Sequence, residues 1–312
     1  MDFVAIIVGL MLLIKGGDLL LDAAVDLSLK INIPKIVIGM TVVSFATSAP
    51  ELIVSIKSAL MGYPDLALGN VVGSNVANLA FVLGVVLIIS PIRVTKSFYK
   101  TDWPIMMIAT LLFYFFLQAD GYLNQVEGGI LFVLLLIFLI YLIFFQKKAV
   151  FEEKIEINEK ETPLTQLTFT FFIGGFFLWL GSEVLINSAV SLATSLGVSE
   201  RIISVSVVSI GTSIPELSAS IIAIINKEKA ISIGNLIGSN IFNILAVMGI
   251  TSMIHPINVM DRAILDNDFF WMIGVSLLIF PLVFFPKKMH LGRLEGLCLL
   301  IVYGLFLNQM FT

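Results

Sequence analysis

The stretch SFATSAPE, residues 44–51, occurs a second time as SIGTSIPE, residues 209–216, and each copy interrupts a long apolar run. A Glu in hydrocarbon is disfavoured by roughly 2.5 kcal/mol or more, so intramembrane acids usually face a cavity or a partner. Pro removes a helical N–H and displaces the carbonyl four residues earlier, here that of Ala46 or Gly211. Free carbonyls beside a carboxylate predict a cation site.

Composition restricts the class of protein. Of the 312 residues, 58% are hydrophobic and 13% are charged, and the mean hydropathy is +1.04, which indicates a polytopic membrane protein. A net charge of −4 without a basic cluster argues against a nucleic-acid partner, and the single Cys298 excludes an internal disulfide. The first apolar run, residues 3–14, follows Asp2 rather than a basic residue, so we expect a retained span and not a signal peptide.

Apolar segments of about the length of a bilayer predict an all-α polytopic membrane protein with ten transmembrane helices. The first and sixth segments are longer than one span needs, which predicts either tilt or a break at Gly16-Gly17 and at Gly181. A polar linker, residues 147–165, separates two domains, residues 1–146 and 166–312. We place the spans at residues 3–29, 34–60, 66–90, 103–119, 125–146, 166–195, 200–226, 231–254, 268–285 and 293–311.

The two domains are sequence repeats. Adding 165 to a residue number relates seven pairs without a gap: Asp18 and Glu183, Thr47 and Thr212, Pro50 and Pro215, Glu51 and Glu216, Gly69 and Gly234, Asn78 and Asn243, and Pro91 and Pro256. Further on, the offset becomes 168, since Glu127-Gly128 matches Glu295-Gly296. Five spans per repeat is an odd number, so the second repeat enters the membrane upside down. Inverted repeats are typical of secondary transporters, whose site lies between the repeats near the midplane.

The placement of Lys and Arg gives an orientation. All but four of the 18 basic residues fall in the loops between spans 1 and 2, 3 and 4, 5 and 6, 7 and 8, and 9 and 10; the others are Lys15, Lys57, Arg201 and Arg262. By the positive-inside rule, we expect both termini outside, the linker 147–165 in the cytoplasm, and the protein in the plasma (inner) membrane.

The expected chemistry lies in spans 2, 3, 7 and 8. Residues four apart share a helix face, so we expect Thr47 above Glu51 and Thr212 above Glu216. Span 3 carries GNVVGSNVAN, residues 69–78, and span 8 carries GNLIGSNIFN, residues 234–243, which align Ser74 with Asn78 and Ser239 with Asn243. Oxygen donors without His or Cys favour Ca²⁺ or Na⁺. The GxxxG spacing at Gly69, Gly73, Gly234 and Gly238 predicts close helix packing.

These paired motifs resemble the α-repeats of the cation/calcium antiporter superfamily, and are most similar to its prokaryotic sodium/calcium exchangers. The resemblance covers essentially the whole chain. It implies exchange of Ca²⁺ for Na⁺ by alternating access, with Ca²⁺ and Na⁺ as substrates and no cofactor or enzymatic activity. It also implies central calcium ligands at Glu51 and Glu216, surrounded by sodium sites that use Ser44, Thr47, Ser48, Ser74, Asn78, Ser209, Thr212, Ser213, Ser239 and Asn243.

One departure from the family pattern concerns the coupling ion. Asn243 stands where some members carry Asp, so the site has two carboxylates, and K⁺ coupling stays open. Proton-coupled relatives tend to carry an acid at the positions of Asn78 and Asn243, so the two amides favour Na⁺. The linker is too short for the cytoplasmic regulatory domain of animal exchangers, and we expect a monomer in the lipid bilayer to suffice.

Simpler interpretations are available for some of these features. A single membrane Pro is often a plain kink, although two copies each followed by Glu make that interpretation weaker. Lys15 lies one turn from Asp18, which favours a local ion pair over a role in transport for Asp18 and its equivalent Glu183. A cation channel could use the same donors, and flux without a counter-ion would distinguish it. An intramembrane hydrolase is disfavoured because no His or Asp is placed to activate Cys298 or a serine.

Overall fold

Helices dominate the computed structural model, which describes residues 2–30, 33–144, 163–195 and 209–310. The elements are labelled α for α-helices, η for π-helical segments and β for short strands. Up to residue 144 they are α1 (Asp2–Lys30), α2 (Lys35–Ile38), η1 (Gly39–Val43), α3 (Ser44–Thr47), α4 (Ala49–Leu60), α5 (Pro64–Val76), η2 (Ala77–Val82), α6 (Leu83–Ile89), β1 (Ile92–Arg93), η3 (Phe98–Asp102), α7 (Trp103–Asp120), β2 (Tyr122–Leu123) and α8 (Gln125–Phe144).

The second part of the chain has a similar order of elements. They are α9 (Leu164–Ser195), α11 (Ser209–Thr212), α12 (Ile214–Ile225), α13 (Lys229–Phe242), η6 (Asn243–Met248), α14 (Gly249–Ile254), β3 (Ile257–Asn258), η7 (Ile264–Asp268), α15 (Phe269–Phe284), β4 (His290–Leu291) and α16 (Arg293–Met310). Most of the predicted linker and the start of the predicted seventh span fall at residues 145–162 and 196–208, outside the described residues.

Several of the helices are long and apolar enough to cross a bilayer. Within the described residues seven continuous helices meet both criteria, and the bent pair Lys35–Thr47 and Ala49–Leu60 makes an eighth if it counts as one span. The chain is therefore a multi-pass membrane protein. Two predicted spans begin earlier than expected, at Phe98 and Ile264, because a π-helical segment precedes α7 and α15.

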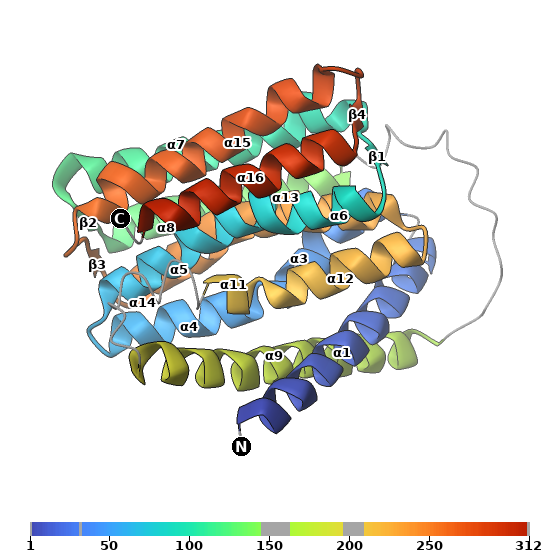
Figure 1. Ribbon diagram of the computed structural model, residues 1–312, viewed down its shortest axis with the longest axis horizontal. Coiled ribbons are helices and arrows are strands. Elements are labelled where there is room, and N and C mark those ends of the chain that lie inside the picture. Colours follow the sequence, from blue (N-terminus) through green and yellow to red (C-terminus); the bar gives the residue numbers. More distant parts are fainter. Residues whose placement is uncertain (1, 31–32, 145–162, 196–208, 311–312) are drawn as a thin grey trace.

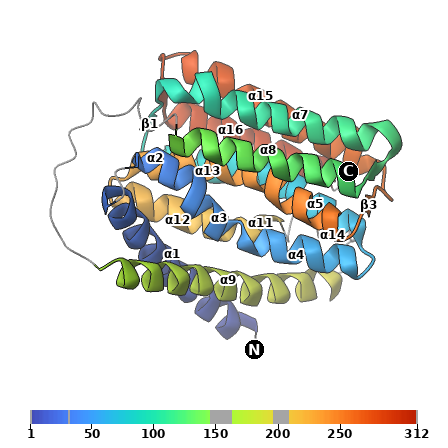
Figure 2. The same ribbon diagram turned by 180° about the vertical axis from the view of Figure 1, so that it is seen from behind.

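The helices form layers whose long axes run in broadly the same direction (Figures 1 and 2). Helices α1 and α9 lie together at one edge, and α7, α8, α15 and α16 lie toward the opposite edge. The segments Pro64–Ile89 and Lys229–Ile254 lie between them and are mostly buried within the protein. By contrast, most of α8 is exposed at the protein surface, as expected for an apolar helix that contacts lipid.

The long helices α1 and α9 are unbroken, so of the two predicted alternatives, tilt or a break at Gly16-Gly17 and at Gly181, the break does not occur. The glycines of α1 instead allow close packing. A Cβ atom added at Gly16 would lie 2.7 Å from the backbone N of Leu178, and one added at Gly174 would lie 2.7 Å from the backbone N of Leu20. The two backbones therefore touch where the helices meet, which a larger side chain would prevent.

Contacts between the two halves of the chain occur in exchanged pairs. Strand β1 pairs antiparallel with β4, placing Ile92 opposite Leu291, and β2 pairs antiparallel with β3, placing Leu123 opposite Ile257. The residues of β3 lie 165 positions after those of β1, and the residues of β4 lie 168 positions after those of β2. Exchanging the two halves of the chain therefore turns the β1–β4 pairing into the β3–β2 pairing.

Close helix packing at glycines shows the same equivalence between the two halves of the chain. A Cβ atom added at Gly296 would lie 2.9 Å from the carbonyl oxygen of Gly84, and one added at Gly128 would lie 2.8 Å from that of Gly249. Gly84 is equivalent to Gly249, and Gly128 to Gly296. Helix α16 thus packs on α6 as α8 packs on α14.

Helix α13 packs closely against α2 and η1 at the centre of the molecule. A Cβ atom at Gly234 would lie 2.5 Å from the carbonyl oxygen of Ile36, and one at Gly238 would lie 2.7 Å from the Cα atom of Met40. The predicted packing role of these two glycines is confirmed. Their small size brings the polar face of α13 against the α3 segment of the other half.

Candidate cation site

Both copies of the repeated motif form a helix break with the same geometry. Helix α3 ends at Thr47 and α4 begins at Ala49; Ser48 between them has φ −83° and ψ 6°. In the second copy Ser213 has φ −81° and ψ −1° and separates α11 from α12. Each break is followed by a Pro in the first turn of the next helix, where its missing N–H leaves no bond unmade. The flanking helices at Ser48 differ in direction by 43°.

The two predicted acids occupy the first turns of the helices that follow these breaks. Glu51 lies at the start of α4 and Glu216 at the start of α12, where the helix dipole favours a negative charge. Both side chains have no exposed area, and Ser48, three residues before Glu51, donates a hydrogen bond to Glu216. Two carboxylates buried in this way, when ionised, need a compensating positive charge.

Most of the carboxylate oxygens lack a protein hydrogen-bond partner. Neither side-chain oxygen of Glu51 has one, and Oε2 of Glu216 has none. Oε1 of Glu216 accepts a hydrogen bond of 3.3 Å from the hydroxyl of Ser48 in the other half. Buried polar atoms are normally paired, so unpaired carboxylate oxygens indicate a place for a ligand.

Thr47, Asn235 and Ser239 form a polar cluster beside the carboxylates, here called the first corner. The Thr47 hydroxyl donates to Oδ1 of Asn235 at 3.2 Å and lies 3.3 Å from the hydroxyl of Ser239. The amide Nδ2 of Asn235 is in turn 3.4 Å from the hydroxyl of Ser220, to which it donates. Each of these side chains is buried.

Thr212, Asn70 and Ser74 form the equivalent second corner. The Thr212 hydroxyl donates to Oδ1 of Asn70 at 3.1 Å and lies 3.0 Å from the hydroxyl of Ser74. Nδ2 of Asn70 donates to the hydroxyl of Ser55 at 3.0 Å and to the backbone oxygen of Glu51 at 3.3 Å. Each corner therefore joins a broken helix of one half to an intact helix of the other.

Helical spacing predicted only part of this arrangement. It relates Thr47 to Glu51 and Thr212 to Glu216 of the same half, whereas the hydrogen bonds of both hydroxyls reach side chains of the opposite half. Backbone hydrogen bonds of helical spacing continue across the bends at Ser48 and Ser213, but such spacing carries no information about partners on another helix.

Backbone oxygens of the two predicted serines also lie in these corners. The hydroxyl of Thr47 is 3.4 Å from the carbonyl oxygen of Ser44, and that of Thr212 is 3.3 Å from that of Ser209. The hydroxyl of Ser74 also reaches the Ser209 carbonyl oxygen, at 3.4 Å. These carbonyls add neutral oxygen donors to the two acids.

Three further predicted residues are buried and keep unpaired polar atoms. These are both amide atoms of Asn78, Oδ1 of Asn243 and the hydroxyl of Ser213. Among the described residues no third Asp, Glu, His or Cys joins Glu51 and Glu216 in a metal-binding group. The available donors are thus two carboxylates with hydroxyl, amide and carbonyl oxygens, a set that suits hard cations.

Four buried asparagines of the site were not among the predicted residues: Asn70, Asn75, Asn235 and Asn240. They follow Gly69, Ser74, Gly234 and Ser239, so the signal was present inside the two GN-x-x-GSN stretches. Asn has low preference for the middle of a helix, and four such residues in buried helices require polar partners.

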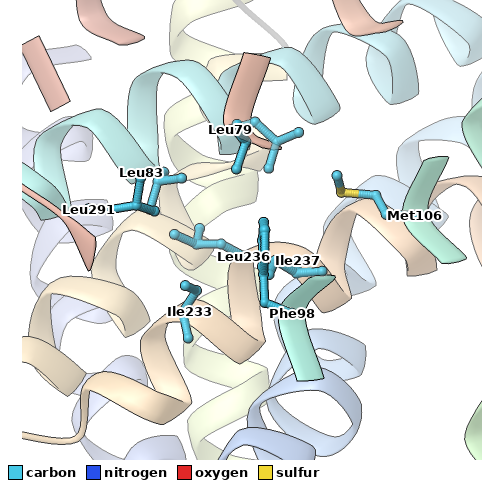
Figure 3. A pocket seen from close by; sticks show the side chains of 9 residues that line it. Leu79, Leu83, Phe98, Met106, Ile233, Leu236, Ile237 and Leu291 are labelled. Carbon is cyan, nitrogen blue, oxygen red and sulfur yellow. The ribbon is translucent and has the colours of Figure 1, made fainter. Parts of the chain in front are cut away.

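A small cavity near the midpoint of α13 does not belong to this site. Apolar side chains line it, among them Leu79, Leu83, Leu236 and Ile237 (Figure 3). Its volume of about 10 Å³ is close to that of a single water-sized probe, and it offers no polar partner. It therefore has no capacity to hold an ion.

Fold and site together define a multi-pass membrane protein with a candidate site for a hard cation between its two halves. The chain belongs to the sodium/calcium exchanger protein family, whose model matches residues 1–144 and 166–311. The resemblance to this family expected from the repeated motifs is confirmed.

Relatives and solved structures match along nearly the whole chain. The chain is 35% identical to the protein CaxA of Alkalimonas amylolytica, over 96% of this chain and 95% of that protein. It is 29% identical to the sodium/calcium exchanger MaX1 of Methanosarcina acetivorans, over 99% and 98% of the two chains. A solved structure of the sodium-calcium exchanger NCX_Mj, soaked with Na⁺ and Ca²⁺, superposes with a TM-score of 0.80 at 25% identity, over 98% of this chain and 97% of that one.

Proposed function

We propose that the chain is a secondary active transporter that exchanges Ca²⁺ for Na⁺ across the membrane. The observation that carries this proposal is the pair Glu51 and Glu216, fully buried and with three of four side-chain oxygens unpaired. One Ca²⁺ or two Na⁺ would neutralise them. Membership of the sodium/calcium exchanger family and the names of its relatives support the same ions.

In this proposal both carboxylates bind Ca²⁺ directly. Na⁺ ions use the surrounding donors, which are the twelve predicted side chains or their backbone oxygens: Ser44, Thr47, Ser48, Glu51, Ser74, Asn78, Ser209, Thr212, Ser213, Glu216, Ser239 and Asn243. Because the two ions share donors, binding of one displaces the other. The empty site holds two negative charges in a low-dielectric interior, and this penalty opposes its crossing without a load. Coupled exchange follows from that penalty.

We further propose that ten spans in two inverted repeats, residues 1–146 and 166–312, give the site access to each side in turn. The exchanged pairs of strands and glycine contacts support an approximate two-fold relation between the halves. Both corners join an element of one half to an element of the other, so relative movement of the halves would open or close them. Such movement around a central site is how repeat-built transporters alternate access.

The orientation and oligomeric state belong to the same proposal. We place the protein in the plasma (inner) membrane with both termini outside and residues 147–165 in the cytoplasm, because most Lys and Arg residues fall in the loops on one side. A single chain supplies both corners and both acids, so a monomer is expected to transport.

The decisive experiment is uptake of radioactive calcium into proteoliposomes under an outward gradient of Na⁺, K⁺ or H⁺, each with the other cations equal on both sides. We expect uptake with the Na⁺ gradient alone. Uptake that follows K⁺ or H⁺ instead would assign a different coupling ion. Uptake that continues with no counter-ion would contradict exchange and indicate a channel.

A further inference from the structure

A chain of two hydrogen bonds connects buried asparagines across the two halves. Nδ2 of Asn243 donates to Oδ1 of Asn75 at 3.1 Å, and Nδ2 of Asn75 donates to the backbone oxygen of Asn240 at 3.3 Å. The Asn240 side chain donates separately to the backbone oxygen of Leu236, at 2.7 Å. Asn75 lies on α5 and Asn243 begins η6, so the chain passes from one half to the other.

The backbone oxygen of Asn240 fixes the direction of this chain. A side-chain amide can rotate to exchange its oxygen and nitrogen, but a backbone carbonyl accepts hydrogen bonds and cannot donate them. If Asn75 rotated, its Oδ1 would face the Asn240 oxygen, and two acceptors would meet in a buried place. Asn75 therefore keeps Oδ1 toward Asn243, and Asn243 keeps Nδ2 toward Asn75.

This fixed direction leaves Oδ1 of Asn243 available. That atom is buried and has no hydrogen-bond partner in the described structure. A cation binds an amide through its oxygen and is repelled by the NH₂ group, so the orientation of Asn243 decides whether it can serve as a ligand. An Asp at the same position would offer an oxygen in either orientation.

The equivalent asparagine of the first half is not held in this way. Asn78 corresponds to Asn243, and Asn240 corresponds to Asn75. Both amide atoms of Asn78 lack a partner within the described residues, and so does Oδ1 of Asn240. The symmetric bond between Asn78 and Asn240 is thus not made, and one of the two central amides is oriented while the other is free to rotate.

We propose that Asn75 is a positioning residue for transport: it orients the amide of Asn243 so that Oδ1 faces the cation site. Asn75 acts through Asn243, since its Oδ1 accepts a hydrogen bond from Asn243 and its Nδ2 donates to the backbone oxygen of Asn240. This inference rests on the proposed function. It means that a residue of the first half, Asn75, orients a proposed ligand of the second half, Asn243.

The test is calcium binding and Na⁺-driven calcium uptake by Asn75→Leu, which keeps the size of the side chain and removes its acceptor. We expect the half-saturating Ca²⁺ concentration to rise roughly five-fold, about the effect of losing one net hydrogen bond, with maximal flux retained. Asn240→Leu is the matched control. It occupies the equivalent position and keeps its backbone oxygen, so we expect no comparable rise.

A second background separates orientation from packing. In the Asn243→Asp protein a carboxylate oxygen is available in either orientation and meets Oδ1 of Asn75 as a second acceptor, so adding Asn75→Leu should not raise the half-saturating Ca²⁺ concentration. An unchanged value for Asn75→Leu alone, or an equal rise in both backgrounds, would overturn the proposal. If Asn75→Leu does not fold, Asn75→Ala gives the same comparison without added bulk.

Glu51→Gln distinguishes failure of this inference from failure of the proposed function. If Glu51→Gln loses Ca²⁺ binding while Asn75→Leu binds normally, the central site stands and the role of Asn75 is wrong. If Glu51→Gln itself binds and transports Ca²⁺ normally, the central site is wrong, and the orientation of Asn243 toward it is wrong as well.

Discussion

The two halves of the site are alike in one region and different in another. The first and second corners share their two Thr contacts: a Thr hydroxyl meets an Asn oxygen at 3.2 or 3.1 Å and a Ser hydroxyl at 3.3 or 3.0 Å. Next to the corners this equivalence ends. Ser48 donates to Glu216, whereas its equivalent Ser213 has an unpaired hydroxyl and Glu51 has two unpaired oxygens.

The difference shows that a sequence repeat in gapless register does not impose equal contacts. In the proposed inverted-repeat transporter, one half would have the conformation that the other half adopts when access switches sides. Unequal contacts at equivalent serines and asparagines are expected for one state of such a cycle. Variants at equivalent positions therefore test which contacts the two halves share and which belong to one state.

The largest effect is expected at the shared acids. Glu51→Gln and Glu216→Gln each remove one of two charges that balance Ca²⁺, and loss of a charged partner at a buried site is worth several kcal/mol, so Ca²⁺ uptake should fall by roughly 100-fold or more in both. Proteoliposome uptake measures it, and size-exclusion profiles in detergent should stay normal. Asp266→Asn, at an exposed acid, is the control. Normal uptake in either Gln variant would refute the site.

Glycine packing provides the next prediction. Gly234→Val places branched carbons against the backbone of Ile36, and overpacking of this kind costs about 1–3 kcal/mol, so the thermal unfolding midpoint in detergent should fall. Gly274→Val is the control because no atom lies within 4 Å of an added Cβ there. If the halves pack alike, Gly69→Val should lower the midpoint as much as Gly234→Val. A much smaller drop at Gly69 would show that the packing is not repeated.

A smaller and equal effect is expected at the two corners. Thr47→Val and Thr212→Val keep the side-chain shape and remove one hydroxyl that has two partners, which should raise the half-saturating Na⁺ concentration for exchange about ten-fold in each. Thr251→Val serves as the control because the Thr251 hydroxyl is buried without a hydrogen-bond partner. Clearly unequal effects at Thr47 and Thr212 would mean that the corners are not functionally equivalent.

The smallest effect is expected where the two halves differ. Ser48→Ala removes a hydrogen bond to a carboxylate, and a change of about three-fold in the half-saturating Ca²⁺ concentration is expected; Ser213→Ala removes none and should change it less. The half-saturating Ca²⁺ concentrations of the two variants are measured with purified protein, under conditions that favour a single conformational state. Equal effects would show that the Ser48 contact is not specific to one half.

Much of the architecture was predictable because it depends on local chemistry. Pro50 and Pro215 place the helix breaks, apolar segment length places the membrane helices, and burial of Glu51 and Glu216 follows from their apolar surroundings in the sequence. Of the tilt or break predicted at Gly16-Gly17, the break does not occur, because glycine permits both a break and a close helix contact. A neighbouring helix, α9, decides between them.

The site was less predictable than the fold. Helical spacing assigned Thr47 to Glu51, whereas its hydrogen bonds reach Asn235 and Ser239, and Asn70 and Asn235 were passed over although they stand beside the glycines of the quoted motifs. Spacing along one helix describes neighbours on that helix. It carries no information about which helix of the other half lies opposite.

By itself, the sequence determined that this is a repeated, membrane-embedded chain with two acids at helix breaks and a supply of oxygen donors, since periodicity, hydropathy and Pro act locally. Only the tertiary structure decided which donor meets which acid, and which end of each asparagine amide points inward. Those choices depend on packing between helices more than a hundred residues apart, and a hydrogen bond requires a specific partner at a specific distance.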